Sequence, residues 1–203
     1  LGIIICKKCK KKLDALEINL LEKEIIEIDN EEKHNSKKII IKKFYIYRYD
    51  GIIRDLLIKY KFDDASYLRE LFAELILKNE KVCRFLKNYD IIIPVPISKK
   101  RRIERGYNQT ELIVKFIERK LKEQTIHQKN KQEKDEKHLE IQVNVDILAK
   151  IKNIKSQSKS TLKERINNVK GVYKLVNEDK IKGKKIVIFD DIYTTGSTIK
   201  ECV

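Results

Sequence analysis

The chain has 203 residues, of which 41% are hydrophobic and 38% charged, and its formal net charge is +15. This composition is typical of a globular domain with a heavily charged surface, and no apolar run approaches the roughly 18 residues of a membrane span. The start also lacks a signal-peptide pattern, so we expect a cytoplasmic protein. Because it contains no methionine, we expect a fragment or processed product that is incomplete at both ends.

Residues 1–43 are predicted to be a short cysteine-containing segment followed by a linker or loose loop. Cys6 and Cys9 form a CxxC pair, which can supply two of the four ligands of a tetrahedral zinc site. The other two cysteines and the three histidines have no matching spacing. A redox pair and a chance pairing therefore remain alternatives to half of a zinc knuckle.

From residue 44 the pattern predicts strands and helices in alternation. FYIYRYDG at 44–51 is typical of a strand that leads into a turn. Apolar residues then recur at helical spacing over 52–61 and 67–77, which predicts two amphipathic helices around FDDAS. YDIIIPVP at 89–96 is an apolar run ended by two prolines, and it predicts a buried parallel strand followed by a stiff loop. A third helix is predicted at 111–121.

The remaining segments complete this alternation. Residues 122–140 are polar, and both a solvated helix extension and a disordered insertion fit them. A polar loop at 153–160 precedes TLKE, a capping-box pattern that predicts a short helix over 161–168. Strands are predicted at 171–176 and, in the apolar run IVIFD, at 186–190. Strands alternating with helices predict an α/β fold with a parallel sheet.

The positive charge is concentrated in two segments. Residues 97–120 hold 8 Lys or Arg against 3 acids, and residues 150–185 hold 12 against 3. A lysine-rich coding bias explains the total charge equally well, but it does not explain the clustering. The clusters favour an anionic ligand, either a phosphate-bearing small molecule or nucleic acid.

Two acids and a hydroxyl-rich turn follow the last predicted strand. IVIF is apolar on both faces, as in a central parallel strand, so Asp190 and Asp191 are expected at its carboxyl end, where ligands bind in open α/β sheets. In TTGST, backbone N–H groups at a helix N-terminus can bind an anion, and Gly196 permits a tight turn. The hydroxyl donors of this turn are Thr194, Thr195, Ser197 and Thr198.

A ribose 5-phosphate fits both features, with its phosphate in the turn and its hydroxyl groups on the two acids. An ordinary strand, N-cap and helix is the simpler alternative. A Walker B strand is also apolar and ends in acids, but the chain contains no GxxxxGKS or GxxxxGKT sequence to accompany it.

The same string resembles the ribose-phosphate loop of type I phosphoribosyltransferases. Three further stretches make the chain similar to the ComF family of competence-associated, phosphoribosyltransferase-like proteins. They are PVPISKKRRIERGYNQTEL (94–112), SQSKSTLKERINNVKGVY (156–173) and CKKC (6–9). Together the four motifs, in this order, are specific to that family.

The resemblance implies a type I phosphoribosyltransferase fold. Residues 44–203 would form the phosphoribosyltransferase-like domain, truncated at its C-terminus, and residues 1–43 would be a zinc-module remnant and linker. Asp190 and Asp191 would face the ribose hydroxyl groups of phosphoribosyl pyrophosphate (PRPP), whose pyrophosphate carries Mg²⁺, and the turn at 194–198 would bind its 5-phosphate. The implied pyrophosphate loop contains Lys99, Lys100, Arg101, Arg105 and Gly106. Gln157, Arg165 and Asn168 match a family motif without an assigned role.

The chain departs from the family pattern in three places. The second cysteine pair of a structural zinc site would lie upstream of Leu1, so Zn²⁺ is expected only in the intact parent. Lys150, Lys152 and Ile154 stand where arginines and a threonine are usual. The last strand of the sheet would follow Val203.

If the chain is an enzyme, the resemblance implies a pentosyl glycosyltransferase in which a nucleophile displaces pyrophosphate from PRPP. The sequence shows no general base and names no acceptor. A non-catalytic nucleotide sensor and a single-stranded-DNA-binding module are therefore alternatives. Family membership implies a role in natural competence and DNA uptake, with competence proteins as further partners.

Overall fold

The computed structural model describes residues 5–30, 35–129, 141–152 and 170–203. The chain divides into two compact units, Ile4–Asp55 and Leu56–Val203. The sites implied at Gln157, Arg165 and Asn168, the predicted helix at 161–168 and the loop at 153–160 lie outside the described residues.

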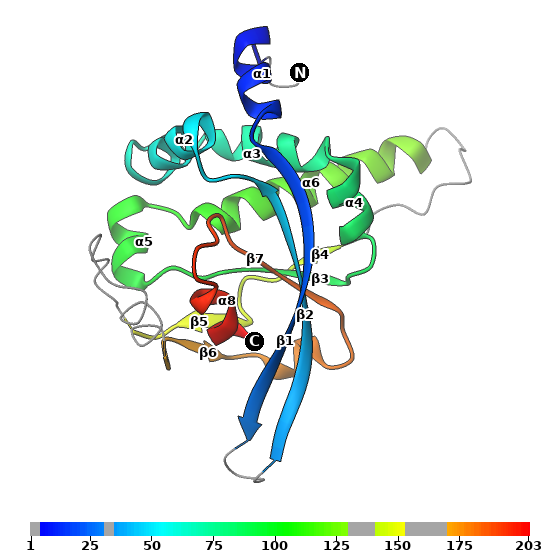
Figure 1. Ribbon diagram of the computed structural model, residues 1–203, viewed down its shortest axis with the longest axis vertical. Helices are drawn as coiled ribbons and strands as arrows, with labels where there is room; N and C mark the ends of the chain where they lie inside the picture. The colour runs from blue at the N-terminus through cyan, green and yellow to red at the C-terminus, as the bar shows by residue number, and fades with distance from the viewer. Residues whose placement is uncertain (1–4, 31–34, 130–140, 153–169) are drawn as a thin grey trace. The chain divides into compact units, whose positions relative to one another are not determined.

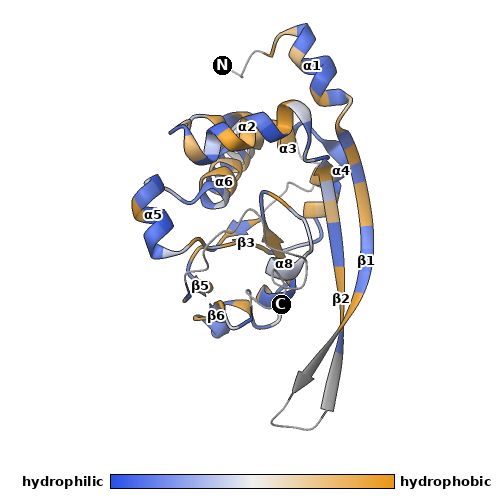
Figure 2. Cartoon of the chain, turned by 60° about the vertical axis from the view of Figure 1, so that its left-hand side comes forward, coloured by the Kyte–Doolittle hydropathy of each residue, from blue (hydrophilic) through white to orange (hydrophobic). Residues whose placement is uncertain are grey.

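The N-terminal unit contains a helix and a long β-hairpin, where a linker or loose loop was predicted. Helix α1 (Lys7–Asp14) is followed by the antiparallel strands β1 (Glu17–Asn30) and β2 (Asn35–Tyr47). Apolar and charged residues are interspersed along both strands (Figure 2), and β-branched isoleucines favour the extended conformation. Lys43 Nζ pairs with Glu24 Oε2 across the hairpin at 2.8 Å.

The C-terminal unit is built on a three-stranded parallel sheet of order β4-β3-β7. β3 (Ile91–Pro94) lies in the centre, between β4 (Gln142–Val143) and β7 (Ile186–Phe189). All four residues of β3 are buried, as predicted for a parallel strand covered on both faces. The expected α/β architecture with a parallel sheet flanked by helices is confirmed.

Helices cover one face of this sheet. α6 (Gln109–Lys129) packs against β3, β4 and α3 (Leu68–Leu77), and α2 (Gly51–Phe62) lies on the same side (Figure 1). The helices predicted at 52–61, 67–77 and 111–121 are thus confirmed. α6 extends past the predicted end to Lys129, which favours the helix extension for that part of the polar segment. A short helix that was not predicted, α4 (Glu80–Leu86), begins at Asn79, whose side chain accepts hydrogen bonds from the N–H groups of residues 81 and 82.

The other face of the sheet packs on a second, smaller sheet. β5 (Leu148–Lys150) and β6 (Tyr173–Leu175) form an antiparallel pair that lies with α8 (Ser197–Cys202) on the side away from α6 (Figure 1). Ile91 and Ile93 of β3 form a core with Ile147 and Leu148. The strand predicted at 171–176 is confirmed at its centre, and a 3₁₀ turn (Glu178–Ile181) connects it towards β7.

Two details of the sheet differ from expectation. Within the described residues β7 is an edge strand and its residues are half-buried, so β3 rather than β7 has the central position. The predicted loop directly after β3 is present at residues 95–98, but the implied pyrophosphate loop that follows it is helix α5 (Lys99–Arg105). Ser98 caps its start by accepting from the N–H of Arg101, and Gly106 ends it in the left-handed conformation at φ 79°.

Candidate functional site

Asp190 and Asp191 lie where the sequence places them, at the carboxyl end of β7. Pro94 and Phe189 are partners in the parallel register of β3 and β7, and the Val95 N–H donates to the Phe189 carbonyl at 2.9 Å. The loops that follow the two strands therefore leave the sheet side by side. This shared edge is the usual place for a ligand in an open α/β sheet.

The two acids have different surroundings. Oδ2 of Asp191 is buried and pairs with Lys61 Nζ at 2.7 Å, and the two side chains are only 5% and 16% exposed. Asp190 accepts the N–H of Asp191 on Oδ1 at 2.9 Å. Burial and the neighbouring Asp191 raise the pKa of Asp190 to about 7, against the smaller opposing effect of Lys61. Near neutral pH, Asp190 is therefore the carboxyl group poised to exchange a proton.

The hydroxyl-rich turn begins α8 as predicted. Gly196 has φ 73°, a left-handed conformation that favours glycine. A Cβ at this position would also overlap the Tyr193 hydroxyl, so both the backbone conformation and the available space require glycine. Thr195 Oγ1 lies 2.8 Å from Ser197 Oγ and accepts the Ser197 N–H at 3.4 Å. These hydroxyl groups satisfy one another, and a bound anion would have to compete with those bonds.

The five residues of the predicted pyrophosphate loop lie on α5 and its C-cap, and their side chains have different environments. Lys99 and Lys100 are exposed. Arg105 is half-buried, donates to Gln109 Oε1, and places its guanidinium 5.5 Å from the Phe62 ring. Burial lowers the pKa of Arg105, whereas the electrostatic attraction to Asp191 raises it. Of these basic residues, Arg105 is the one that the structure brings towards the acids.

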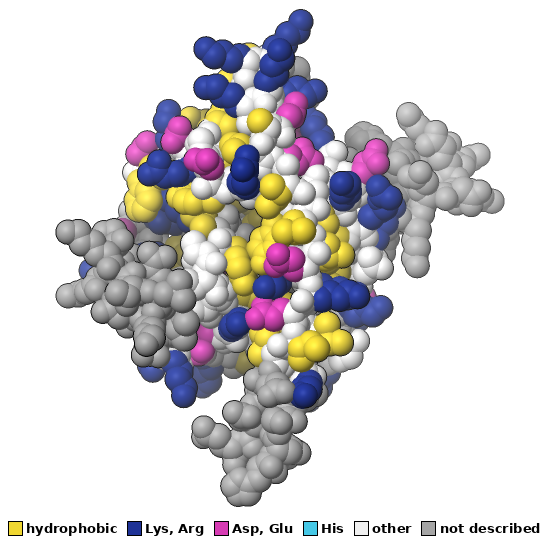
Figure 3. All heavy atoms as spheres, in the orientation of Figure 1, with side chains coloured by type: hydrophobic (Ala, Val, Ile, Leu, Met, Phe, Trp, Pro, Cys, Tyr) yellow, Lys and Arg dark blue, Asp and Glu magenta, His cyan; other side chains and the backbone are white. Residues whose placement is uncertain are grey.

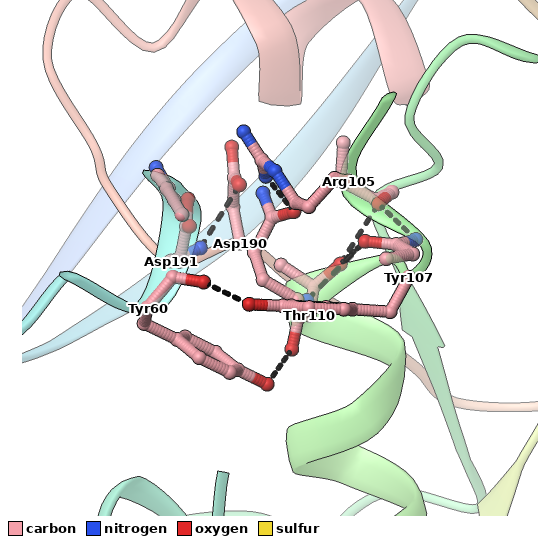
Figure 4. A network of polar contacts seen from close by, with 10 residues as sticks. Tyr60, Arg105, Tyr107, Thr110, Asp190 and Asp191 are labelled. Atoms are coloured by element: carbon pink, nitrogen blue, oxygen red, sulfur yellow. Dashed lines mark hydrogen bonds and ion pairs between the residues drawn. The ribbon is translucent and has the colours of Figure 1, made fainter. Parts of the chain in front are cut away.

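The RGYNQ segment (105–109) forms hydrogen bonds that join α2 and the end of β3 to the start of α6 (Figure 4). Asn108 Nδ2 and Thr110 Oγ1 both donate to the Val95 carbonyl, at 3.1 and 2.9 Å, which ties the start of α6 to the end of β3. The Tyr60 hydroxyl donates to the Gln109 carbonyl at 3.0 Å, and the Tyr107 hydroxyl donates to the Tyr60 carbonyl. These bonds satisfy buried polar groups and clamp α2 to the loop.

Sequence reasoning missed the contribution of α2. Tyr60, Lys61 and Phe62 end this helix, and each contacts the site, although the segment was predicted only as an amphipathic helix. One signal was available: Lys61 stands four residues after the buried Leu57, a position on the apolar side of the helix.

Lys150 is a second basic residue at the site. Its Nζ donates to the Tyr173 hydroxyl at 3.3 Å and lies 5.1 Å from that ring's centroid. Burial lowers the pKa of Lys150 and nearby Arg101 adds to this, while Asp190 acts in the opposite direction. Lys150 is one of the positions at which the chain departs from the family pattern, and it still places a cationic side chain near the acids.

The cysteine pair lies at the start of α1. Cys6 caps α1 and accepts the Cys9 N–H on Sγ at 3.4 Å, a bond that lowers the pKa of the Cys6 thiol. Among the described residues, no three His, Cys, Asp or Glu side chains are grouped as metal ligands. The described part of the chain thus supplies two ligands where a structural zinc ion needs four.

Comparison with known proteins connects the chain to bacterial competence. It is 26% identical to competence protein F of Haemophilus influenzae over 150 residues. The aligned region covers 72% of this chain and 58% of that protein. The chain is 28% identical over 154 residues to competence protein ComFC of Streptococcus pneumoniae, covering 76% and 56%. The chain is thus similar to competence proteins of the ComF family. A third relative, DNA utilization protein YhgH of Escherichia coli O157:H7, is 26% identical over 144 residues, covering 70% and 55%.

The chain spans about half the length of the curated relatives it matches. No family model matches the sequence, and no solved structure matches it. In the part of the chain that the structure describes, none of the helices combines the length and apolar character needed to cross a bilayer.

Proposed function

We propose that this chain binds PRPP, or another ligand that contains ribose 5-phosphate, at the carboxyl ends of β3 and β7. The observation that carries the proposal is the partly buried acid pair Asp190 and Asp191 at this edge, directly before a hydroxyl-rich turn. Paired carboxylates accept hydrogen bonds from the 2′- and 3′-hydroxyl groups of a ribose. Thr194, Thr195, Gly196, Ser197 and Thr198 would hold the 5-phosphate through backbone and hydroxyl donors.

Cationic groups around the acids support a ligand with more than one phosphate. Arg105 is attracted to Asp191 from α5, and Lys150 to Asp190 from β5. They come from different elements, so a pyrophosphate could contact either group. Lys99, Lys100 and Arg101 remain candidates for the pyrophosphate on the outer turns of α5. Mg²⁺ would bind mainly to the ligand's own phosphate oxygens, which suits its preference for few protein ligands.

The chemistry proposed for an active enzyme is transfer of the phosphoribosyl group. A nucleophile attacks C1 of the ribose and pyrophosphate leaves with the bonding electron pair, so cationic groups near the leaving oxygens would stabilise the developing charge. The same binding site without an acceptor would make a nucleotide sensor, and fold alone does not decide between them. Release of pyrophosphate in the presence of amines or nucleobases distinguishes the enzyme from the sensor.

A role in natural competence or DNA utilization follows from the relatives' names, and we propose that the chain acts there in the cytoplasm. Single-stranded DNA is a second candidate ligand, favoured by two basic helices. α1 carries five exposed lysines, gathered on its surface in Figure 3, and α5 adds exposed Lys99, Lys100 and Arg102. Phosphate contacts of this kind predict an affinity that falls steeply with salt and is insensitive to base sequence.

Thermal unfolding with and without PRPP and Mg²⁺ tests the ribose-phosphate proposal. Ligand at 100 times its Kd stabilises a protein by about 2.7 kcal/mol. Asp190→Asn/Asp191→Asn should lose this shift, whereas Asp179→Asn, which changes an exposed acid of the 3₁₀ turn, should retain it. No shift in the folded wild-type chain would refute PRPP binding, and salt-dependent binding of single-stranded DNA would then support the second candidate.

A further inference from the structure

The last turn of α2 delivers a lysine to the acid pair. Tyr60, Lys61 and Phe62 contact the Gln109 carbonyl, Asp191 and Arg105, respectively. The apolar stripe of α2 explains why Tyr60 is buried, but it does not explain why a lysine follows. The proposed ligand contacts make no use of Lys61 either.

The position of Lys61 is set by its neighbour. Tyr60 is fully buried, with its ring centroid 5.6 Å from that of Tyr107 and 5.5 Å from that of Phe72. The hydroxyl of Tyr60 donates to Gln109, and its carbonyl accepts from Tyr107. Because these contacts hold the backbone of residue 60, the next side chain is directed to Asp191 rather than to solvent.

The charges explain what this lysine does. Two adjacent carboxylates repel each other and also repel an anionic ligand, an effect that is large where water is excluded. Lys61 Nζ contacts Oδ2 of Asp191, the buried oxygen, at 2.7 Å. It therefore offsets one of the two negative charges.

We propose that Lys61 is a positioning residue for the acid pair, which orients the Asp191 carboxylate and offsets its charge so that both acids can accept hydroxyl groups of an anionic ligand. The identity of that ligand rests on the proposed function. The effect of Lys61 on the acids does not, because it follows from the contact between Lys61 and Asp191 itself.

Asp190 is the group whose titration reports on this role. Lys61 lowers the pKa of Asp190, and Asp191 raises it. The ionisable groups that interact with Asp190 come from four elements and the adjacent residue: Lys61 of α2, Lys150 of β5, Tyr173 of β6, Cys202 of α8, and Asp191. Removing Lys61 alone leaves the others in place and should move the midpoint of Asp190 to higher pH.

The experiment compares Lys61→Met and Lys61→Arg with Lys59→Met, which changes an exposed lysine of the same helix. In the full chain without ligand, NMR of ¹³C-carboxyl-labelled aspartate follows the titration of Asp190, whose signal is assigned with Asp190→Asn. Calorimetry then measures PRPP binding in the presence of Mg²⁺ from about pH 6 to about pH 9.

We expect Lys61→Met to raise the Asp190 midpoint by about one pH unit. PRPP binding at pH 7 should weaken about fivefold, because the ionised fraction of Asp190 falls from about one half to about one tenth, and it should recover towards higher pH. Lys61→Arg and Lys59→Met should match the wild type. An unchanged midpoint, or a loss of affinity that is equal at every pH, overturns the proposal.

Two further outcomes separate this proposal from the proposed function. If Lys61→Met does not fold, the variant Asp191→Asn provides the test. It keeps Lys61 and removes the neighbouring negative charge, so the titration midpoint of Asp190 must fall below that of the wild type. A midpoint that does not fall refutes the charge argument. A shifted midpoint in Lys61→Met, in a chain that does not bind PRPP, supports the positioning role and refutes the ligand.

Discussion

The raised pKa of Asp190 makes the stability of this chain depend on pH in a direction opposite to that of most acids. An aspartate titrates near 3.8 when unperturbed, and in the folded chain burial raises the pKa of Asp190 to about 7. Between these values the folded state binds more protons than the unfolded state, so stability decreases as pH rises. The difference of about three pH units corresponds to about 4 kcal/mol at full ionisation.

Asp190→Asn removes this ionisation while keeping a similar shape. Below about pH 4 both proteins carry an uncharged side chain in the folded state, so their free energies of unfolding should be similar. The variant should gain on the wild type as pH rises, and above about pH 8 it should be more stable by about 4 kcal/mol.

Urea unfolding followed by circular dichroism at several pH values measures this difference in a chain that lacks tryptophan. Asp179→Asn, at an exposed acid, is the matched control and should track the wild type at every pH. A stability difference between Asp190→Asn and the wild type that is constant with pH, or that decreases as pH rises, would refute a raised pKa for Asp190.

Three further changes test the structure around the site. Tyr60→Phe should lower the free energy of unfolding by about 1–2 kcal/mol, because the buried Gln109 carbonyl loses its donor; chemical denaturation checks this, and an unchanged midpoint would contradict the clamp. Gly196→Ala should cost about 1–3 kcal/mol and abolish the PRPP-induced thermal shift, since a Cβ at φ 73° is strained and overlaps the Tyr193 hydroxyl; retained binding would show that the turn tolerates it. Ile92→Ala, in the central strand, should cost about 2–5 kcal/mol through the cavity it leaves, and thermal unfolding showing a loss below 1 kcal/mol would argue against β3 as the core strand.

Local sequence patterns were sufficient for the elements that position the candidate site. Apolar residues at helical spacing predicted α2, α3 and α6, and the continuous apolar runs at 89–96 and 186–190 predicted β3 and β7. The acid pair was predicted at the end of β7 because strand, carboxylates and turn are contiguous in the chain. These predictions depend on interactions between residues close in sequence, which a pattern records directly.

The sequence also contained local signals that were not used. Ser98 and Gly106 flank seven residues without a helix breaker, which is the capping pattern of a short helix, yet the segment was predicted as a loop. Isoleucines between charged residues in 17–47 favour strands, but β1 and β2 form through pairing with each other, and a hairpin depends on that partner as much as on propensity.

The sequence by itself therefore determined the α/β class, the helices α2, α3 and α6, and the location of Asp190 and Asp191. Only the tertiary structure decided that β3 rather than β7 is central, that Tyr60 is bonded to the RGYNQ segment, and that Lys61 pairs with Asp191. These contacts join residues that are far apart in the chain. Their energies depend on burial and on the distance between charges in space, and no periodicity along the sequence records either quantity.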